Sequence, residues 1–202
     1  MKIARMSPCL ALLAAFAVQA KDPQADKPPQ LTAEQQAMMQ AYEKAALPGE
    51  PHKQLAGMVG QWTTQQTVWW DPDTPPVKQQ GSVTNTMELG GRHVRQEYSS
   101  QWMGKPFQGV GYTGYDNVTG QYYSAWMDSA STGLFVSYGS YDPASRTYTF
   151  KGQMADPARQ GAMVPMRQTV RVTDHDHHVM DMFETRDGKE VKVMQIEYAR
   201  TK

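Results

Sequence analysis

The sequence has almost no cysteine, no long apolar run and no excess of charge of either sign. Its single cysteine is Cys9, so an internal disulfide is excluded. The most apolar run, Leu10 to Val18, has nine residues, whereas a bilayer-spanning helix needs about 20. None of the motifs G-x-S-x-G, H-E-x-x-H and C-x-x-C-H occurs. The sequence therefore offers no motif for an enzymatic activity and favours a binding or structural role.

The first 20 residues have the pattern of a secretory signal peptide. Lys2 and Arg5 precede the apolar run, and Val18 and Ala20 stand where a signal peptidase recognises small or aliphatic residues. Cleavage after Ala20 would leave 18 basic and 20 acidic residues, a net charge of about −2. Such a balance argues against a nucleic-acid partner or an anionic membrane surface. The sequence predicts a periplasmic or secreted protein that is not inserted in a membrane after cleavage.

Residues 21–51 predict a polar leader followed by one helix. Thr32 and Gln35 have the spacing of a capping box, which marks the start of a helix. Apolar residues recur at helical spacing over 38–46. The prolines and glycine of residues 48–51 are expected to end this helix.

Residues 52–202 predict a β-barrel domain. Short runs rich in Val, Thr, Tyr, Trp and Phe alternate with turn residues, and the connections are too short for crossover helices. Sequential antiparallel strands avoid open edges by closing into an up-and-down barrel. The predicted fold class is all-β, an antiparallel barrel of about ten strands preceded by one N-terminal helix. The expected strands are residues 61–70, 77–89, 93–102, 107–116, 121–129, 133–142, 146–155, 163–173, 178–187 and 190–200.

The stretch GVGYTG, Gly109 to Gly114, matches the G-x-G-x-x-G of dinucleotide-binding folds. That motif needs a helix that begins on the glycines, because the helix N-terminus binds the pyrophosphate. Here a hairpin turn and another aromatic strand follow. Gly109 and Gly111 share one face of a predicted strand, where bare backbone allows a bend or lets a side chain pack against it. The motif therefore predicts barrel curvature and not nucleotide binding.

Several segments resemble the bacterial domain-of-unknown-function family 1579. They are LAGMVGQW, LGGRHVRQEY, the run from Met103 to Gly133 and the closing MQIEYAR. The resemblance covers roughly His52 to Arg200. It implies a lipocalin-like or calycin-like barrel, and it supplies no catalytic residues because the family carries no established activity.

Gly60-Gln61-Trp62 resembles the G-x-W that opens lipocalin barrels. In those barrels a basic side chain from near the last strand stacks on the tryptophan, and Arg200 has the corresponding place. Such a cation–π contact is worth about 0.5–2 kcal/mol. We expect Arg200 to close the barrel on Trp62. The alternative is that Arg200 anchors a ligand carboxylate, as basic residues do inside fatty-acid-binding barrels.

The expected function is non-covalent binding of a small, largely apolar molecule inside the barrel. After cleavage the chain has twelve methionines, which adapt to varied apolar partners, and a barrel of this size can hold one small ligand. Which strand face points inward stays open, since even- and odd-numbered residues of 93–102 compete for the interior. A structural barrel filled by its own side chains is the alternative. The residues expected to line a ligand site are Tyr98, Trp126, Tyr138 and Met182.

A metal or haem protein, or an enzyme using the same histidines, is the other possibility. His175 with His177, or His178 with Met180, stand two apart and could share zinc or copper. The same residues also fit a polar hairpin turn, and a structural site would need further ligands from distant strands. No motif calls for a cofactor. The conceivable axial ligands for haem are His52, His93 and His178.

Overall fold

The computed structural model describes residues 31–71 and 73–201. The predicted signal peptide and leader lie outside these residues. The chain forms two compact units, Met1–Ala41 and Tyr42–Lys202. In the described ranges, no helix combines the length and the apolar character that a membrane crossing requires.

Two helices precede the barrel strands. Helix α1, Ala33–Ala46, begins at the predicted capping box: the Gln35 N–H donates to Thr32 Oγ1 (3.2 Å), and the Thr32 N–H donates to Gln35 Oε1 (2.9 Å). Helix α2, Glu50–Ala56, was not expected. Pro51 lies in its first turn, where the missing N–H costs no helical hydrogen bond. The proline that was expected to mark the end of one helix therefore begins another.

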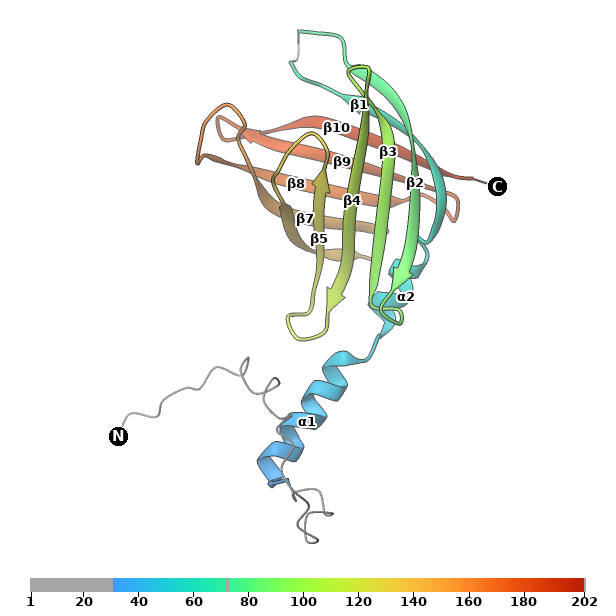
Figure 1. Cartoon of the computed structure of the whole chain (residues 1–202), viewed down its shortest axis with the longest axis vertical. Coiled ribbons are helices and arrows are strands. Elements are labelled where there is room, and N and C mark those ends of the chain that lie inside the picture. Colours follow the sequence, from blue (N-terminus) through green and yellow to red (C-terminus); the bar gives the residue numbers. More distant parts are fainter. Residues whose placement is uncertain (1–30, 72, 202) are drawn as a thin grey trace, which may run out of the picture. The chain divides into compact units, whose positions relative to one another are not determined.

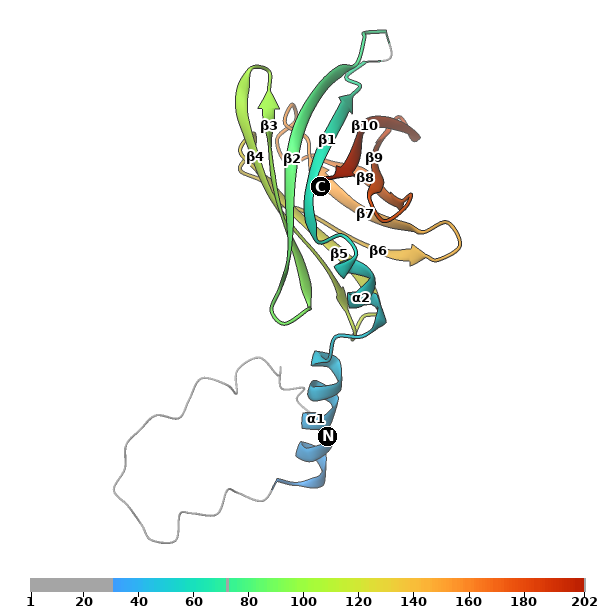
Figure 2. The ribbon, with the colours of Figure 1, turned by 90° about the vertical axis from the view of Figure 1, so that its right-hand side faces the viewer.

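Ten antiparallel strands form a closed barrel (Figures 1 and 2). Each strand pairs with its neighbours in sequence, and β1 pairs with β10. The predicted fold class is confirmed, and the expected strand limits agree with the observed ones to within two residues. The strands are β1 (Gly60–Val68), β2 (Val77–Glu88), β3 (His93–Trp102), β4 (Lys105–Asp116), β5 (Gln121–Asp128), β6 (Phe135–Asp142), β7 (Thr147–Ala155), β8 (Met163–Val172), β9 (His177–Arg186) and β10 (Lys189–Arg200).

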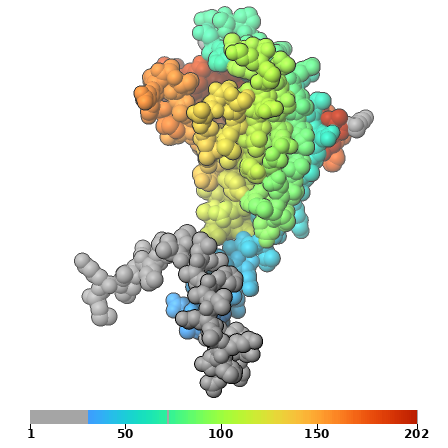
Figure 3. All heavy atoms as spheres, in the orientation of Figure 1, coloured from blue at the N-terminus to red at the C-terminus, as the bar shows by residue number. Residues whose placement is uncertain are grey.

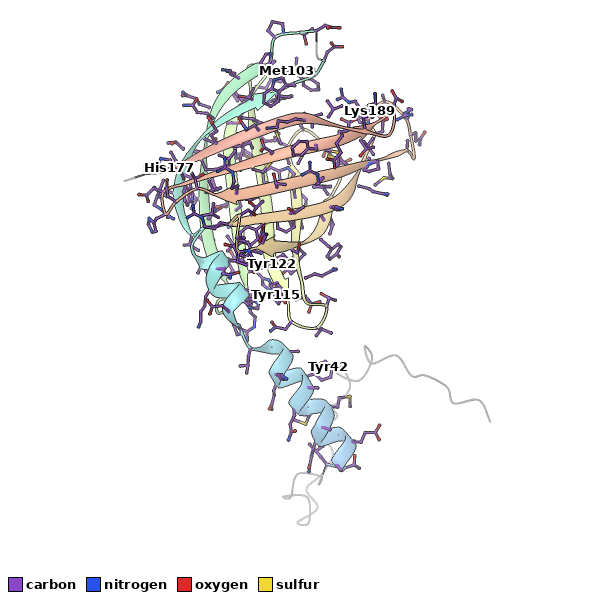
Figure 4. The ribbon with its side chains drawn as sticks, turned by 180° about the vertical axis from the view of Figure 1, so that it is seen from behind. Tyr42, Met103, Tyr115, Tyr122, His177 and Lys189 are labelled. Atoms are coloured by element: carbon purple, nitrogen blue, oxygen red, sulfur yellow. The ribbon has the colours of Figure 1, made fainter. Side chains whose placement is uncertain are left out.

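The two ends of the barrel differ. We call the end with the β1–β2, β3–β4, β5–β6, β7–β8 and β9–β10 connections the mouth, and the end next to α2 the closed end. Figure 4 shows Met103 and Lys189 at the mouth and Tyr115 and Tyr122 near α2. Two hairpins at the mouth have two-residue turns, Met103–Gly104 (φ 50° and 77°) and Asp187–Gly188 (φ 50° and 76°). Positive φ at both central residues matches the twist of the flanking strands.

Helix α2 covers the closed end. Its Leu55 is 1% exposed and packs with Val94, Tyr122 and Tyr148. The Tyr122 hydroxyl donates to Gln54 Oε1 at 2.7 Å. Burial of a leucine side chain contributes about 1.5–3 kcal/mol. The buried His52, whose Nε2 contacts the Tyr115 carbonyl, also holds α2 against the barrel. The front strands β2–β5 form a continuous outer surface above it (Figure 3).

The glycine motif of β4 provides a surface for a tryptophan. Gly111 pairs with Trp126 of β5, and a Cβ built on Gly109 would overlap the Trp126 ring. The Trp126 Nε1–H donates to Asp128 Oδ2 at 2.9 Å, which fixes the indole along the strand. A side chain therefore packs against bare backbone at Gly109 and Gly111, as the sequence predicted.

Replacement of Gly109 by alanine should lower the free energy of unfolding by about 1–3 kcal/mol, because the added methyl group overlaps the Trp126 indole. The matched control is Gly133→Ala, where a Cβ would meet only Ser131 Oγ at 3.8 Å. Urea unfolding followed by tryptophan fluorescence measures both. Equal stabilities for the two variants would contradict the packing of Trp126 on Gly109.

Candidate functional site

The pairing register determines which residues face the interior. On β3 the even-numbered residues point inward: Val94 is 4% and Tyr98 is 5% exposed, whereas Glu97 is exposed. Tyr98 pairs with Val83 of β2 and with Gly109 of β4, which are also buried. Because paired residues share a face, the inner face can be followed from strand to strand around the barrel.

Three of the four residues expected to line a ligand site lie on this inner face. The rings of Tyr98 and Trp126 meet edge to face at 6.2 Å, and Met182 packs against the same buried cluster. Tyr138 is different, because it follows the fully buried Ser137 and alternation turns it to the outer face. It is 56% exposed, so it does not line the interior with the other three.

Strands β1–β3 give the interior a polar wall that the sequence analysis did not identify. Gln66 and Gln79 are cross-strand partners, and Gln79 Nε2 donates to Gln66 Oε1 at 2.5 Å. The Tyr98 hydroxyl donates to the same oxygen at 3.3 Å. Glutamines are normally surface residues, so composition gave no reason to place them inside. The signal that could have found Gln66 is its place in the alternating row of Trp62 and Thr64, and Gln79 follows as its cross-strand partner.

The strands on either side of this polar wall make an apolar part of the interior. Met182 of β9 pairs with Met194 of β10, and both pack against the buried cluster of Trp62, Tyr98 and Ile196 together with Phe107 and Trp126. Met182, Met194, Phe107 and Trp126 are only half-buried although they point into the barrel. By contrast, the inner residues at the closed end, such as Tyr148 and Phe150, are 2% exposed. The interior is therefore more accessible around these four side chains than around Tyr148 and Phe150.

Several hydroxyl groups inside the barrel have no partner. Among the described residues, the buried side-chain atoms without a hydrogen bond are Thr64 Oγ1, Asn85 Oδ1, Ser100 Oγ and Ser137 Oγ. Thr64, Ser100 and Ser137 belong to the inner-face rows of β1, β3 and β6. A buried hydroxyl without a partner costs about 1–3 kcal/mol. These atoms have donor and acceptor capacity that a bound molecule could use.

Arg200 and Trp62 lie together where β1 meets β10. The guanidinium carbon of Arg200 is 4.1 Å from the Trp62 ring centroid. Its N–H groups donate to the backbone oxygens of Val59 (2.6 Å), Gly57 (2.9 Å) and His175 (3.1 Å). These contacts fit the closure role expected for Arg200, and they engage the donors that a ligand carboxylate would need.

The three neighbouring histidines do not converge. His178 points inward, 5% exposed, between Trp62 (centroids 4.5 Å apart) and Tyr198 (stacked, 4.2 Å). His175 and His177 are exposed and hydrogen-bond to Asp176 and Asp174. Residues 177 and 178 are adjacent on a strand, so their side chains leave opposite faces. Among the residues that the structure describes, no three His, Cys, Asp or Glu side chains form a group able to hold a metal ion.

The other two histidines considered for haem, His52 and His93, lie outside the barrel interior. Both ring nitrogens of His52 contact the protein, Nδ1 with the Gly49 N–H (3.0 Å) and Nε2 with the Tyr115 carbonyl (3.1 Å). His93 Nδ1 hydrogen-bonds to the Tyr123 hydroxyl. Burial lowers the pKa of His93, and the neighbouring His52 and Arg92 charges lower it further.

A cavity of about 470 Å³ lies next to His52 and His93, on the outer face near the closed end. Arg92, His93 and Asp116 are among its lining residues, together with the rings of Tyr123 and Tyr138. Arg92 Nη2 donates to the Ala46 carbonyl at 2.6 Å. The lining thus mixes charged side chains with aromatic rings, and Tyr138 belongs to it and not to the interior.

The burial of His178 should make the protein lose stability in mild acid. Burial, with a smaller effect from Arg200, lowers the pKa of His178 from 6.5 to about 4. The unfolded chain therefore binds this proton first, so folding stability falls as the pH drops from about 6.5 to about 4, by about 3 kcal/mol in total. His178→Phe keeps an aromatic ring between Trp62 and Tyr198 and should remove this part of the stability loss. Urea unfolding at several pH values measures the free energy of unfolding of both proteins.

His177→Gln serves as the control. Because the His177 side chain is exposed, its replacement should leave the stability loss between pH 6.5 and pH 4 unchanged. An unchanged pH dependence in His178→Phe would contradict the assignment.

Comparisons with known proteins agree with the barrel. No curated protein sequence matches the chain. A crystal structure of Rv2717c from M. tuberculosis is similar, with TM-score 0.58 and 14% identity over 76% of this chain and 99% of that one. A DUF3598 protein of unknown function from Nostoc punctiforme aligns with TM-score 0.43 and 13% identity, over 78% of this chain and 53% of that one. At these identities the likeness to Rv2717c describes the fold alone.

The sequence profile of a family described as protein of unknown function, DUF1579, matches residues 47–200. This range contains α2 and all ten strands of the lipocalin-like barrel. The chain belongs to the DUF1579 family.

Proposed function

We propose that this protein binds a small, largely apolar molecule non-covalently inside its barrel, on the mouth side of the packed closed end. The observation that carries the proposal is the half-burial of Met182, Met194 and Trp126, which point inward from the middle or mouth half of their strands. An inward side chain keeps exposed area only where the interior is not filled by other side chains. Methionine and aromatic groups around such a space suit an apolar guest.

The interior suits such a molecule better than the outer cavity does. The outer cavity is lined by Arg92, His93 and Asp116, so an apolar guest there would cover polar and charged groups without replacing their contacts with water. In the interior, the apolar side chains Trp126, Met182 and Met194 pack against one buried cluster. A guest at that position would remove apolar surface from water at about 25 cal/mol per Å².

Fluorescence of the neutral probe N-phenyl-1-naphthylamine tests this function. Wild-type protein should give a saturable increase in emission, and Met182→Trp should abolish it because the larger side chain fills the space. Met127→Trp is the matched control, since Met127 lies on the outer face of β5 and is 44% exposed. Circular dichroism verifies that both variants fold. The function is rejected if wild type gives no saturable increase, or if Met182→Trp binds the probe as wild type does.

We also propose that the protein is exported by cleavage after Ala20. The support is the basic start, the apolar run and the V-x-A end of residues 1–20. The intact mass of the protein recovered from its native cells should correspond to a chain that begins at Lys21. Ala20→Arg should block cleavage and leave the longer form. A native protein that retains Met1 or Lys2 would overturn the proposal.

A further inference from the structure

A polar niche lies on the inner wall of the barrel at Gly81 of β2. A Cβ built on Gly81 would stand 2.9 Å from both Thr64 Oγ1 and the Tyr98 hydroxyl. The absence of a side chain at Gly81 thus allows these two oxygens to approach the same point. Thr64 is 1% and Tyr98 is 5% exposed, so both hydroxyls are held in fixed positions by the surrounding strands.

The niche has hydrogen-bonding capacity that the protein does not use. Thr64 Oγ1 has no partner, and Ser100, the cross-strand neighbour of Gly81, also has an unpartnered Oγ. The Tyr98 hydroxyl donates its proton to Gln66 Oε1, so its oxygen can still accept. The niche can therefore both donate to a bound group and accept from it.

Among the described residues, no charged side chain belongs to the niche formed by Thr64, Gly81 and Tyr98. On the inner face, every charged residue stands within two residues of the end of its strand. At the mouth, Glu184 pairs with Arg186 at 3.1 Å, and Asp128 accepts from Trp126. At the closed end, Arg200 is engaged with Trp62 and backbone carbonyls. A charged group in the niche would lose its hydration without gaining an opposite charge, which is strongly unfavourable.

The apolar wall lies close to the niche. Tyr98 contacts Phe107 and Trp126 edge to face, with centroids 5.9 and 6.2 Å apart, and Met182 and Met194 pack against the same cluster. A molecule with one polar group at Thr64 and Tyr98 would thus place its apolar part against aromatic rings and thioethers. The space favours amphipathic molecules with a single polar end.

We infer that the barrel selects ligands with an uncharged hydroxyl group, an alcohol or phenol, and discriminates against carboxylates of the same length. This inference rests on the proposed function and specifies the class of ligand. The hydroxyl binds at Thr64, Tyr98 and Ser100, where it donates to one oxygen and accepts from another. A carboxylate can only accept and carries a charge that nothing in the niche compensates.

Displacement of N-phenyl-1-naphthylamine by decanol and by decanoate tests the inference. At about pH 8 decanoate is ionised, and decanol should displace the probe at an at least about tenfold lower concentration. Thr64→Val keeps the shape of the side chain and removes the hydroxyl, so it should reduce the preference for decanol by about fivefold to tenfold. It should also fold at least as stably as wild type, because the lost oxygen had no partner.

Thr67→Val is the matched control, since Thr67 is on the same strand and on its outer face. It should keep the full preference for decanol. If the probe binds but decanoate competes as well as decanol, or Thr64→Val leaves the preference unchanged, the inference is overturned while the proposed function stands. If the probe does not bind to wild type, the proposed function itself fails.

Discussion

The pairing of β1 with β10 is the interaction on which closure of the barrel depends. Nine strand pairs join neighbours in the sequence, and only β1 with β10 must join distant parts of the chain. Arg200 reinforces that pair at its end, because it covers the Trp62 ring and donates to the carbonyls of Gly57 and Val59. Those carbonyls lie between α2 and β1. One side chain thereby connects the last strand, the first strand and the helix that covers the closed end.

This arrangement separates the functions of the two ends. At the closed end, Leu55 packs with Tyr122 and Tyr148, and His178 is enclosed between Trp62 and Tyr198. Towards the mouth, Trp126, Met182 and Met194 are half-buried. The packed closed end and the proposed ligand site therefore occupy different layers of the same barrel. The buried polar atoms of the middle layer cost stability, as unpartnered groups at binding sites commonly do.

Much of the fold could be predicted because it follows from local patterns. The strands alternate with turn residues at nearly regular intervals, the capping box of Thr32 and Gln35 marks the start of α1, and the glycines of β4 could only be explained by a strand. Helix α2 was missed because seven residues give too short a pattern, and Pro51 fits a helix start as well as a helix end.

The site was harder to predict than the fold. On β6, Ser137 is buried and Tyr138 is exposed, although the tyrosine is the more apolar residue, because the register is fixed by the whole barrel and not by this strand. Gln66 of β1 and Gln79 of β2 face inward for the same reason. The niche at Gly81 needs residues from three strands, and a single sequence does not reveal which side chains meet across them.

The pairing of β1 with β10 also has a consequence for how the chain folds. The other nine pairs can form as hairpins, in which contacting residues are close in sequence and the entropy lost on loop closure is small. Thr63 and Ala199, which hydrogen-bond across the closing pair, are 136 residues apart. Joining them removes the freedom of almost the whole domain in one step. Barrel closure is therefore the topologically slow event of folding, and until it occurs β1 and β10 are the two open edges through which chains could associate.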